Sequence, residues 1–204
     1  LSNGDTKLLH NSDRSGEDDR FGVLVLRYGN GTNIYNISIS DVKIYDIYPT
    51  PSNSDNRHKG YGIRFESYND SEINYYDNID IDNVDISLTG HYGIHIVNRM
   101  SPANEDFYHR NITITNSKFT NTGGSGIVLA RCKDILVENS HFNGTGASTD
   151  SRMWNRGSGM WTYTCNDATI QNNIFENAYG PQDSFGAHID LSLIHISEPT
   201  RLIG

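Results

Sequence analysis

One segment carries the pattern from which the fold can be inferred: Asn111-Ile-Thr-Ile-Thr-Asn-Ser-Lys-Phe-Thr-Asn-Thr-Gly-Gly-Ser-Gly-Ile-Val-Leu-Ala-Arg131. It holds two short runs of alternating apolar residues, beginning at Ile112 and Ile127, with a polar, glycine-rich stretch between them. The first run restarts at Ile135, so one unit takes 23 residues. A unit of this length is too short for a helical hairpin repeat. It is typical of one coil of a parallel β-solenoid, whose stacked coils enclose a continuous core.

Equivalent positions recur along the chain with uniform chemistry. The first run begins at Ile37, Ile79, Ile112, Ile135 and Ala168. Seven residues after these starts stand Ile44, Ile86, Phe119, Phe142 and Phe175. The second run follows a glycine in each unit, at Gly22, Gly62, Gly93, Gly126, Gly159 and Gly186. Because strand residues alternate between two faces, the residues one and three positions after each glycine are predicted to face inward.

A polar residue four positions after each start is predicted to turn the corner of the coil: Asp41, Asn83, Asn116, Asn139 and Asn172. Asn tolerates the left-handed backbone that a sharp corner needs. Neighbouring coils lie about 4.8 Å apart, so we expect the Asn amides to form a ladder and the phenylalanines to stack. Polar inserts at 49–59, 67–75, 98–109 and 147–156 interrupt the units. Such inserts leave the scaffold as loops, where function tends to lie.

The chain of 204 residues is long enough for one domain with a core. We expect an all-β, right-handed parallel β-helix over residues 21–190, with about five to six coils, preceded by a polar edge at 1–20. Residues 191–204 resemble translated sequencing-adapter read-through. This resemblance predicts a non-native tail and a natural helix that continues further.

Charge and hydropathy narrow the classes of partner. The net charge of −9 disfavours nucleic acid and anionic membranes as partners. No apolar stretch reaches the ~20 residues needed to span a bilayer. We expect a monomer with no membrane span.

Two cysteines, Cys132 and Cys165, each lie six residues after a coil glycine and are predicted to stack in adjacent coils. The coil spacing falls within the roughly 4.4–6.8 Å between Cα atoms that a disulfide requires. Parallel Cβ vectors suit a disulfide poorly, and two buried free thiols would behave as small apolar residues. Both states remain open from the sequence. No pattern of cysteine and histidine spacing indicates zinc.

The residues between the inward positions of the second run are predicted to point outward in two rows. The first row is Leu24, Arg64, His95, Val128, Trp161 and His188. The second row is Leu26, Glu66, Val97, Ala130, Tyr163 and Asp190. This face is enriched in Arg, His, Trp and Tyr although the chain is acidic. Exposed aromatic rings on a flat face suit stacking on sugars or on an apolar partner surface.

Catalytic candidates are the titratable groups on and beside this face. Asp183, His188 and Asp190 form its densest cluster, and His95 stands in the same row. A carboxylate beside an imidazole fixes its tautomer and makes it a usable acid or base. The substrate-binding candidates are Trp161, Tyr163, Arg64, Arg131, Arg156 and Trp154. The alternative is polar decoration of a solvent-facing strand, with the 147–157 loop folded over Trp161.

The repeated Asn-Ile-x-Ile-x-Asn and Gly-Ile-x-[Ile/Leu/Phe] signatures resemble those of right-handed parallel β-helix (pectin-lyase-like) proteins of bacteria. The segments 156–161 and 183–190 are similar to those of secreted members that accompany polysaccharide degradation. The resemblance implies a secreted, periplasmic or cell-surface protein. Pectate lyases of this fold use calcium on an acidic cluster. We find no convincing acidic triad, so no metal ligands are predicted, while calcium stays open as a cofactor.

Three functions are compatible with these patterns. The first is a lyase or glycoside hydrolase acting on an extended, acidic polysaccharide in a groove along the helix axis. A lyase would use His188 or His95 with an arginine, whereas a hydrolase would use Asp183 and Asp190 as acid and base. The second is a non-catalytic carbohydrate-binding module, and the third is a structural adhesin segment.

Overall fold

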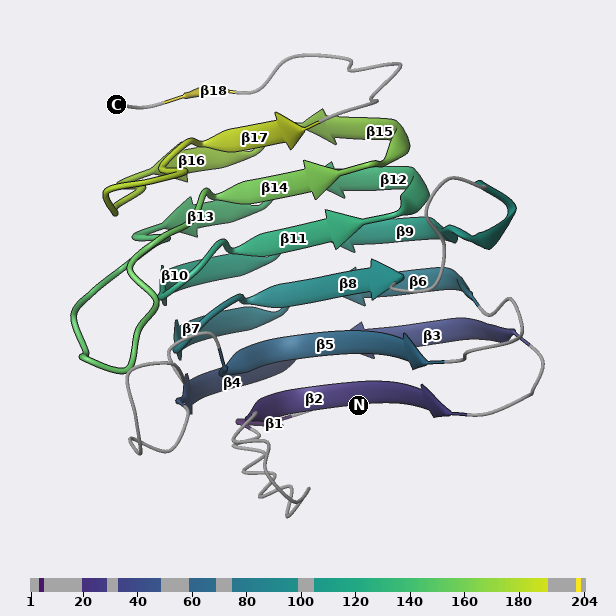
Figure 1. The fold of residues 1–204 in the computed structure, drawn as a ribbon, viewed down its shortest axis with the longest axis horizontal. Coiled ribbons are helices and arrows are strands. Elements are labelled where there is room, and N and C mark those ends of the chain that lie inside the picture. Colours follow the sequence, from purple (N-terminus) through teal and green to yellow (C-terminus); the bar gives the residue numbers. More distant parts are fainter. Residues whose placement is uncertain are drawn as a thin grey trace.

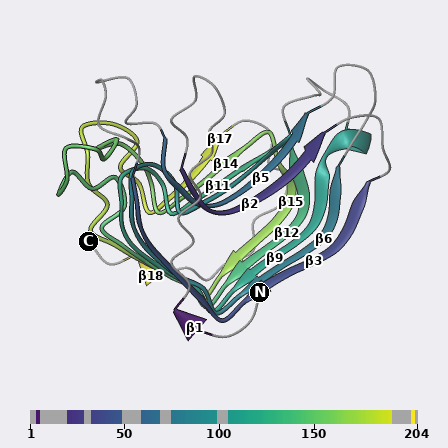
Figure 2. The ribbon, with the colours of Figure 1, turned by 90° about the horizontal axis from the view of Figure 1, so that it is seen from below.

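The chain winds into a parallel β-solenoid (Figure 1). The computed structural model describes residues 20–28, 33–48, 59–68, 75–98 and 105–190, together with two short strands at 4–5 and 201–202. Each coil contributes one strand to each of three parallel sheets, seen edge-on in Figure 2. The predicted fold class, a right-handed parallel β-helix, is confirmed.

The three sheets are named here A, B and C. Sheet A contains, in spatial order, β1 (Gly4–Asp5), β4 (Val42–Ile47), β7 (Asp85–Thr89), β10 (Lys118–Thr122), β13 (His141–Asn143), β16 (Ile174–Glu176) and β18 (Arg201–Leu202). Sheet B contains β17 (Ala187–Asp190), β14 (Met160–Tyr163), β11 (Ile127–Ala130), β8 (Ile94–Asn98), β5 (Tyr61–Tyr68) and β2 (Phe21–Tyr28). Sheet C contains β15 (Asn166–Gln171), β12 (Cys132–Glu138), β9 (His109–Thr115), β6 (Tyr76–Asp82) and β3 (Ile34–Ser40). A 3-10 turn, Glu105–Phe107, lies between β8 and β9.

The predicted columns are confirmed by the strand register. In sheet C the paired residues are Ile37, Ile79, Ile112, Ile135 and Ala168. In sheet A they are Ile44, Ile86, Phe119, Phe142 and Phe175. The three phenylalanine rings stack with centroids 4.8 and 4.6 Å apart. The interior is therefore a continuous apolar stack, because like side chains face one another in successive coils.

The corner between sheets C and A carries the predicted column of Asp and Asn, whose φ angles lie between 51° and 56°. Two further left-handed columns, five residues before and five after it, were missed. They are Asn36, Asn78, Asn111, Asp134 and Asp167, and Asp46, Leu88, Asn121, Gly144 and Asn177. The short polar side chains of Asn and Asp reduce the cost of this conformation.

The expected amide ladder is only partly formed. Asn83 Nδ2 donates to Asp41 Oδ1 at 2.7 Å, as a ladder requires. Asn116 instead donates to Asp82 Oδ1, which also accepts from Thr115. These hydrogen bonds lower the pKa of Asp82. The left-handed backbone therefore determines where Asn and Asp occur at the corner. The hydrogen-bond partner of each Asn is whichever acceptor lies nearest in the next coil.

Both cysteines are free and buried. The thiol of Cys132 contacts Ala130 O at 3.5 Å and that of Cys165 contacts Leu129 O at 3.3 Å. Burial raises the pKa of the Cys132 thiol. The structure thus contains the second of the two alternatives, buried thiols in adjacent coils.

The predicted flanking segments and inserts lie largely outside the described residues. β18 falls within the predicted tail and pairs with β16. In the described ranges, no helix has the length and apolar character to cross a membrane. The fourth insert, at 147–156, is described in full and shapes the site below.

Candidate functional site

The two outward rows of sheet B are confirmed by its register. Arg64, His95, Val128, Trp161 and His188 pair in order across β5, β8, β11, β14 and β17. The second row pairs Glu66, Val97, Ala130, Tyr163 and Asp190. The sequence therefore located the face from which the site is built.

Access to this face differs from one end to the other. Arg64 and Glu66 are 3% and 5% exposed and form an ion pair with each other. Val128 and Ala130 are also buried. Tyr163, in contrast, is 37% exposed. Tyr163 on β14 thus has the most exposed side chain of the two rows, while His95, Val97, Trp161, His188 and Asp190 are half-buried.

An aromatic column runs beside this face, formed by the residue that precedes each coil glycine. Phe21 and Tyr61 stack with centroids 5.7 Å apart, and Tyr61 lies 6.0 Å from Tyr92. The next two coils replace the ring with Ser125 and Ser158. This exchange leaves a gap where two rings would otherwise stand. The column and its gap were not predicted, because the repeat was defined by the residues that follow each glycine.

A long loop, Gly144–Gly157, covers one side of the gap; we call it the strap. In Figure 1 it is the green loop that descends from β13 past the starts of β11 and β8. Ala147 N donates to Thr122 O at 2.8 Å, and Trp154 N donates to Gly90 O at 2.9 Å. The strap is thus held by backbone hydrogen bonds to two earlier coils.

The tip of the strap is fixed by charge and by an aromatic ring. Arg152 binds Asp150 through two hydrogen bonds of 2.8 and 2.6 Å, which lower the pKa of Asp150 to about 2. The Arg152 guanidinium lies 4.0 Å above the ring centroid of Tyr48. Burial and the nearby Asp150 charge raise the pKa of Tyr48 to about 12. These contacts make the strap a fixed wall of the site.

The gap and the strap together enclose a pocket of about 210 Å³. Its lining residues are His91, Tyr92, Ser125, Trp154, Arg156, Gly157, Trp161 and Asp183. Small-molecule sites usually measure roughly 300–1,000 Å³, so this pocket has room for about one sugar-sized ring. Gly157 is required for the close approach of strap and floor, because a Cβ there would lie 2.3 Å from Ser125 N.

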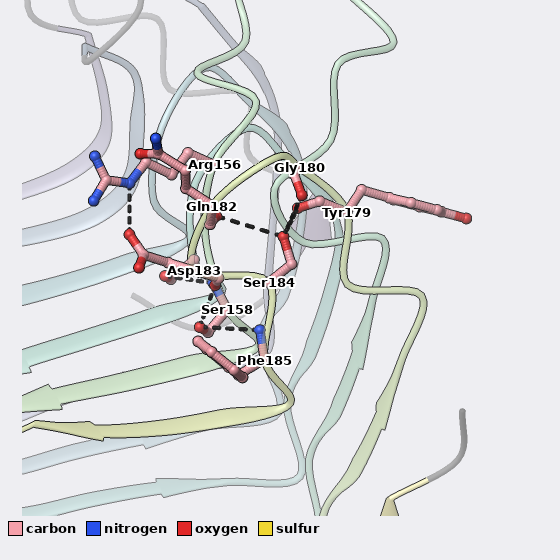
Figure 3. Close-up of polar contacts among 9 residues, drawn as sticks. Arg156, Ser158, Tyr179, Gly180, Gln182, Asp183, Ser184 and Phe185 are labelled. Atoms are coloured by element: carbon pink, nitrogen blue, oxygen red, sulfur yellow. Dashed lines mark hydrogen bonds and ion pairs between the residues drawn. The ribbon is translucent and has the colours of Figure 1, made fainter.

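Asp183 is the carboxylate of the pocket, and its placement is tightly determined (Figure 3). Its Oδ2 accepts from Arg156 Nε at 2.5 Å, and its carbonyl accepts from Ser158 Oγ at 2.5 Å. Its φ is 56°, in the left-handed region. Ser184 Oγ closes the preceding turn onto the carbonyls of Tyr179 and Gly180. These contacts fix the position of the Asp183 backbone and carboxylate relative to the pocket.

Trp161 and His188 form the open floor beside the pocket. Their rings stack with centroids 5.5 Å apart and an interplanar angle of 9°. Phe185 meets His188 edge-on at 5.1 Å. Trp161 Nε1 and His188 Nδ1 are buried and have no hydrogen-bond partner among the described residues.

The two candidate carboxylates lie on the same side of the sheet. Asp183 shares the pocket lining with Trp161, and Asp190 stands two residues after His188, which stacks on Trp161. Two strand residues correspond to about 6.6 Å. Asp183 and Asp190 thus flank the Trp161–His188 pair from opposite ends.

Comparison with known proteins agrees with the fold. A family model described as a right-handed β-helix region matches residues 21–193. The chain belongs to the right-handed β-helix family. No curated protein matches the sequence.

Solved structures resembling this β-helix protein include two of a GH136 lacto-N-biosidase from Eubacterium ramulus. The native protein aligns with a TM-score of 0.61 and 18% identity, over 86% of this chain and 33% of the other. The selenomethionine derivative gives 0.60 and 16%, over 90% and 36%. At this identity the likeness establishes the fold alone. The chain spans about a third of the length of these proteins.

Four predicted site residues of this β-helix protein meet in the pocket: Trp154, Arg156, Trp161 and Asp183. His188, Tyr163 and Asp190 adjoin them on β14 and β17. His91 and Tyr92, which the sequence analysis did not select, complete the pocket wall, their rings stacked with centroids 3.6 Å apart. The signal for Tyr92 was the aromatic column before each glycine, and His91 is its neighbour in the chain.

Three predicted site residues lie elsewhere. His95 does not line the pocket; it stacks on Tyr61 at 5.4 Å and lies behind the lining residue Tyr92, with ring centroids 5.0 Å apart. Arg64 is buried in its ion pair with Glu66. Arg131 donates from Nη1 to Asn98 O at 2.9 Å. These two arginines, like Arg156, are engaged by acceptors of the protein itself, so the expected cationic face is largely compensated within the fold.

Two further observations concern metal binding by the described residues and the protonation of Tyr92. Within the part of the chain that the structure describes, no group of three or more His, Cys, Asp and Glu is arranged to hold a metal. Burial raises the pKa of Tyr92 to about 12, which makes its phenol a hydrogen-bond donor near neutral pH.

Proposed function

We propose that this protein is a carbohydrate-active β-helix protein that hydrolyses a neutral glycan, with one sugar ring seated in the pocket between Trp154 and Trp161. The observation that carries the proposal is the pocket itself, which combines two tryptophans, Tyr92 and the Asp183 carboxylate. Aromatic faces pack against the apolar face of a pyranose, while carboxylate and phenol bind its hydroxyl groups.

Hydrolysis is favoured over elimination by the acid and base groups at hand. Asp183 and Asp190 lie on either side of the Trp161–His188 pair and are the carboxylates that a hydrolase would use as acid and base. The contact with Arg156 fixes the orientation of the Asp183 carboxylate in the pocket. A lyase needs a base and a free cation beside a uronate. Tyr92, with a pKa of about 12, is a poor base at neutral pH.

The proposed substrate is a neutral glycan, whereas the sequence led us to expect an acidic polysaccharide. Arg156 in the pocket already binds Asp183, and Arg64 binds Glu66. The chain carries a net charge of −9, which repels polyanions at long range. The structurally similar proteins are lacto-N-biosidases, so lacto-N-biosides are the first neutral substrates to test.

The test is release of p-nitrophenol from p-nitrophenyl lacto-N-bioside by the 204-residue chain. Asp183→Asn and Asp190→Asn are each expected to lower kcat/KM by about 100-fold to 10,000-fold, the usual contribution of a general acid or base. Asp167→Asn is the matched control, because Asp167 is an exposed corner residue of sheet C that keeps its left-handed conformation as Asn. Equal activity of all three variants would contradict the assignment.

Non-catalytic glycan binding is the second candidate, and the ion pair of Asp183 with Arg156 favours it. A carboxylate held by a guanidinium is well suited to orienting a sugar hydroxyl without transferring a proton. Binding of lacto-N-biose that is lost in Trp161→Ala, with no turnover of any glycan by the unaltered protein, would select this function.

A further inference from the structure

We infer that Tyr163 forms a second sugar subsite, so that the glycan lies along β14, across the solenoid axis. This inference rests on the proposed function and adds to it a direction and a second binding residue. The sequence analysis placed the groove along the axis, and the burial pattern of sheet B opposes that direction.

Along the axis toward the N-terminal coils, the path from the pocket is closed. His91 and Tyr92 stand at that side of the pocket, and the Trp154 ring packs against His91 at 5.9 Å. Val128, the outward neighbour of Trp161 in this direction, is 5% exposed, and past the half-buried His95 the Arg64 side chain is 3% exposed. A second sugar ring therefore finds no open outward side chain directly beside Trp161 in this direction.

Along the strand the surface is open. Tyr163 follows Trp161 at the next outward position of β14, about 6.6 Å away, and has the most exposed side chain of its row. Its neighbour across the strand pair with β11 is Ala130, which is too small to cover the ring. A second sugar, linked to the sugar that stacks on Trp161, thus reaches the face of Tyr163 in an extended glycan.

The chemistry beside Tyr163 suits the position. Asp190 pairs with Tyr163 across β14 and β17, so the two side chains are neighbours in the same outward row. The bond that joins the two sugars then passes between Trp161 and Tyr163, within the space flanked by Asp183 and Asp190. An aromatic platform with an adjacent carboxylate binds both the apolar face and the hydroxyl groups of a pyranose.

Saturation-transfer NMR and calorimetric titration with lacto-N-biose, galactose and N-acetylglucosamine test the second subsite. Tyr163→Ala is expected to weaken the disaccharide by about twofold to tenfold, the effect of losing one aromatic contact, and to leave monosaccharide binding unchanged. Trp161→Ala is expected to weaken the binding of all three sugars. Tyr179→Ala is the matched control, since this tyrosine is 51% exposed and points away from Asp183 and Phe185 (Figure 3).

The outcomes separate the two proposals. Equal disaccharide affinity of the Tyr163→Ala and Tyr179→Ala variants, with sugar binding still lost in Trp161→Ala, would overturn the second subsite alone. Failure of the unaltered protein to bind or cleave any of the sugars would remove the proposed function together with it.

Discussion

The two ends of the outward face of sheet B occupy identical positions in the repeat and yet do opposite things. On β5, Arg64 and Glu66 are buried and bind each other. On β17, the equivalent residues His188 and Asp190 adjoin a pocket and an exposed tyrosine. The scaffold supplies the same outward positions in both coils. Whether such a position stabilises the fold or meets a ligand depends on what covers it.

The difference shows why a polar residue on a solvent-facing row is weak evidence of function by itself. Glu66 and Asp190 belong to one column and are both acidic, although only Asp190 is accessible. A buried ion pair makes its partners structural, since removing one leaves the other charged and desolvated. The comparison therefore predicts that equivalent substitutions in the two coils have opposite consequences for stability and activity.

Glu66→Gln should have the largest effect on stability. The variant leaves the Arg64 guanidinium buried without its carboxylate, and breaking such a pair costs about 3–5 kcal/mol of unfolding free energy. Asp190→Asn, in the same column, should change stability by less than about 0.5 kcal/mol, as half-exposed positions usually do. Urea denaturation followed by circular dichroism measures both values. A similar urea midpoint for the two variants would show that burial does not determine how much a residue of this column contributes to stability.

Acid sensitivity provides a second way to sharpen the comparison. His109 is fully buried between β9 and β6, where its Nδ1 accepts from Tyr76 N at 3.0 Å. Burial lowers the pKa of His109 to about 4, from an ordinary value of 6.5. Above pH 6.5 the imidazole is neutral in both states and contributes no pH dependence. Between pH 6.5 and 4 the unfolded chain binds the proton more readily, so the folded state loses stability as the pH falls.

The total loss is about 3 kcal/mol, and it levels off below pH 4, where both states are protonated. Urea midpoints measured from pH 7.5 to 3.5 give the slope. His109→Gln should flatten this dependence, because a side-chain amide accepts the same hydrogen bond without titrating. An unchanged slope in the variant would assign the acid sensitivity to the carboxylates instead.

The sequence predicted the columns accurately because a coil repeats its chemistry locally. Asp41 and Asn83 mark a corner, and Phe119 and Phe142 mark the core, from spacing alone. Of the two additional left-handed columns, the one after the corner is interrupted by Leu88 and Gly144, which hides its Asn and Asp pattern. The one before the corner, from Asn36 to Asp167, is uninterrupted and could have been read from spacing.

The site was only partly predictable, for a different physical reason. Trp154 reaches the pocket because the strap binds back to Gly90, two coils earlier, and no local pattern encodes that path. Burial of Arg64 likewise depends on what packs over sheet B. Periodicity determines which way a side chain points, and non-local contacts determine what it meets.

The gap in the aromatic column gives the smallest and most specific test. Ser125→Phe restores a ring next to Tyr92 and fills the pocket. We expect the affinity for lacto-N-biose to fall by at least about tenfold, or 1.4 kcal/mol. Stability should change little, since the lost acceptor for Ser158 N, now 3.0 Å from Ser125 Oγ, is worth about 1 kcal/mol and the buried ring offsets it.

Ser125→Ala is the matched control for this substitution, because it removes the same hydrogen bond and leaves the pocket empty. It should retain sugar binding and lose about 1 kcal/mol of stability. Sugar affinity measured by calorimetry in both variants separates volume from hydrogen bonding. If Ser125→Phe bound lacto-N-biose as well as Ser125→Ala, the ligand would lie outside the gap. The contrast between the closed and open ends of the face would then have to rest on Tyr163 and Asp190 alone.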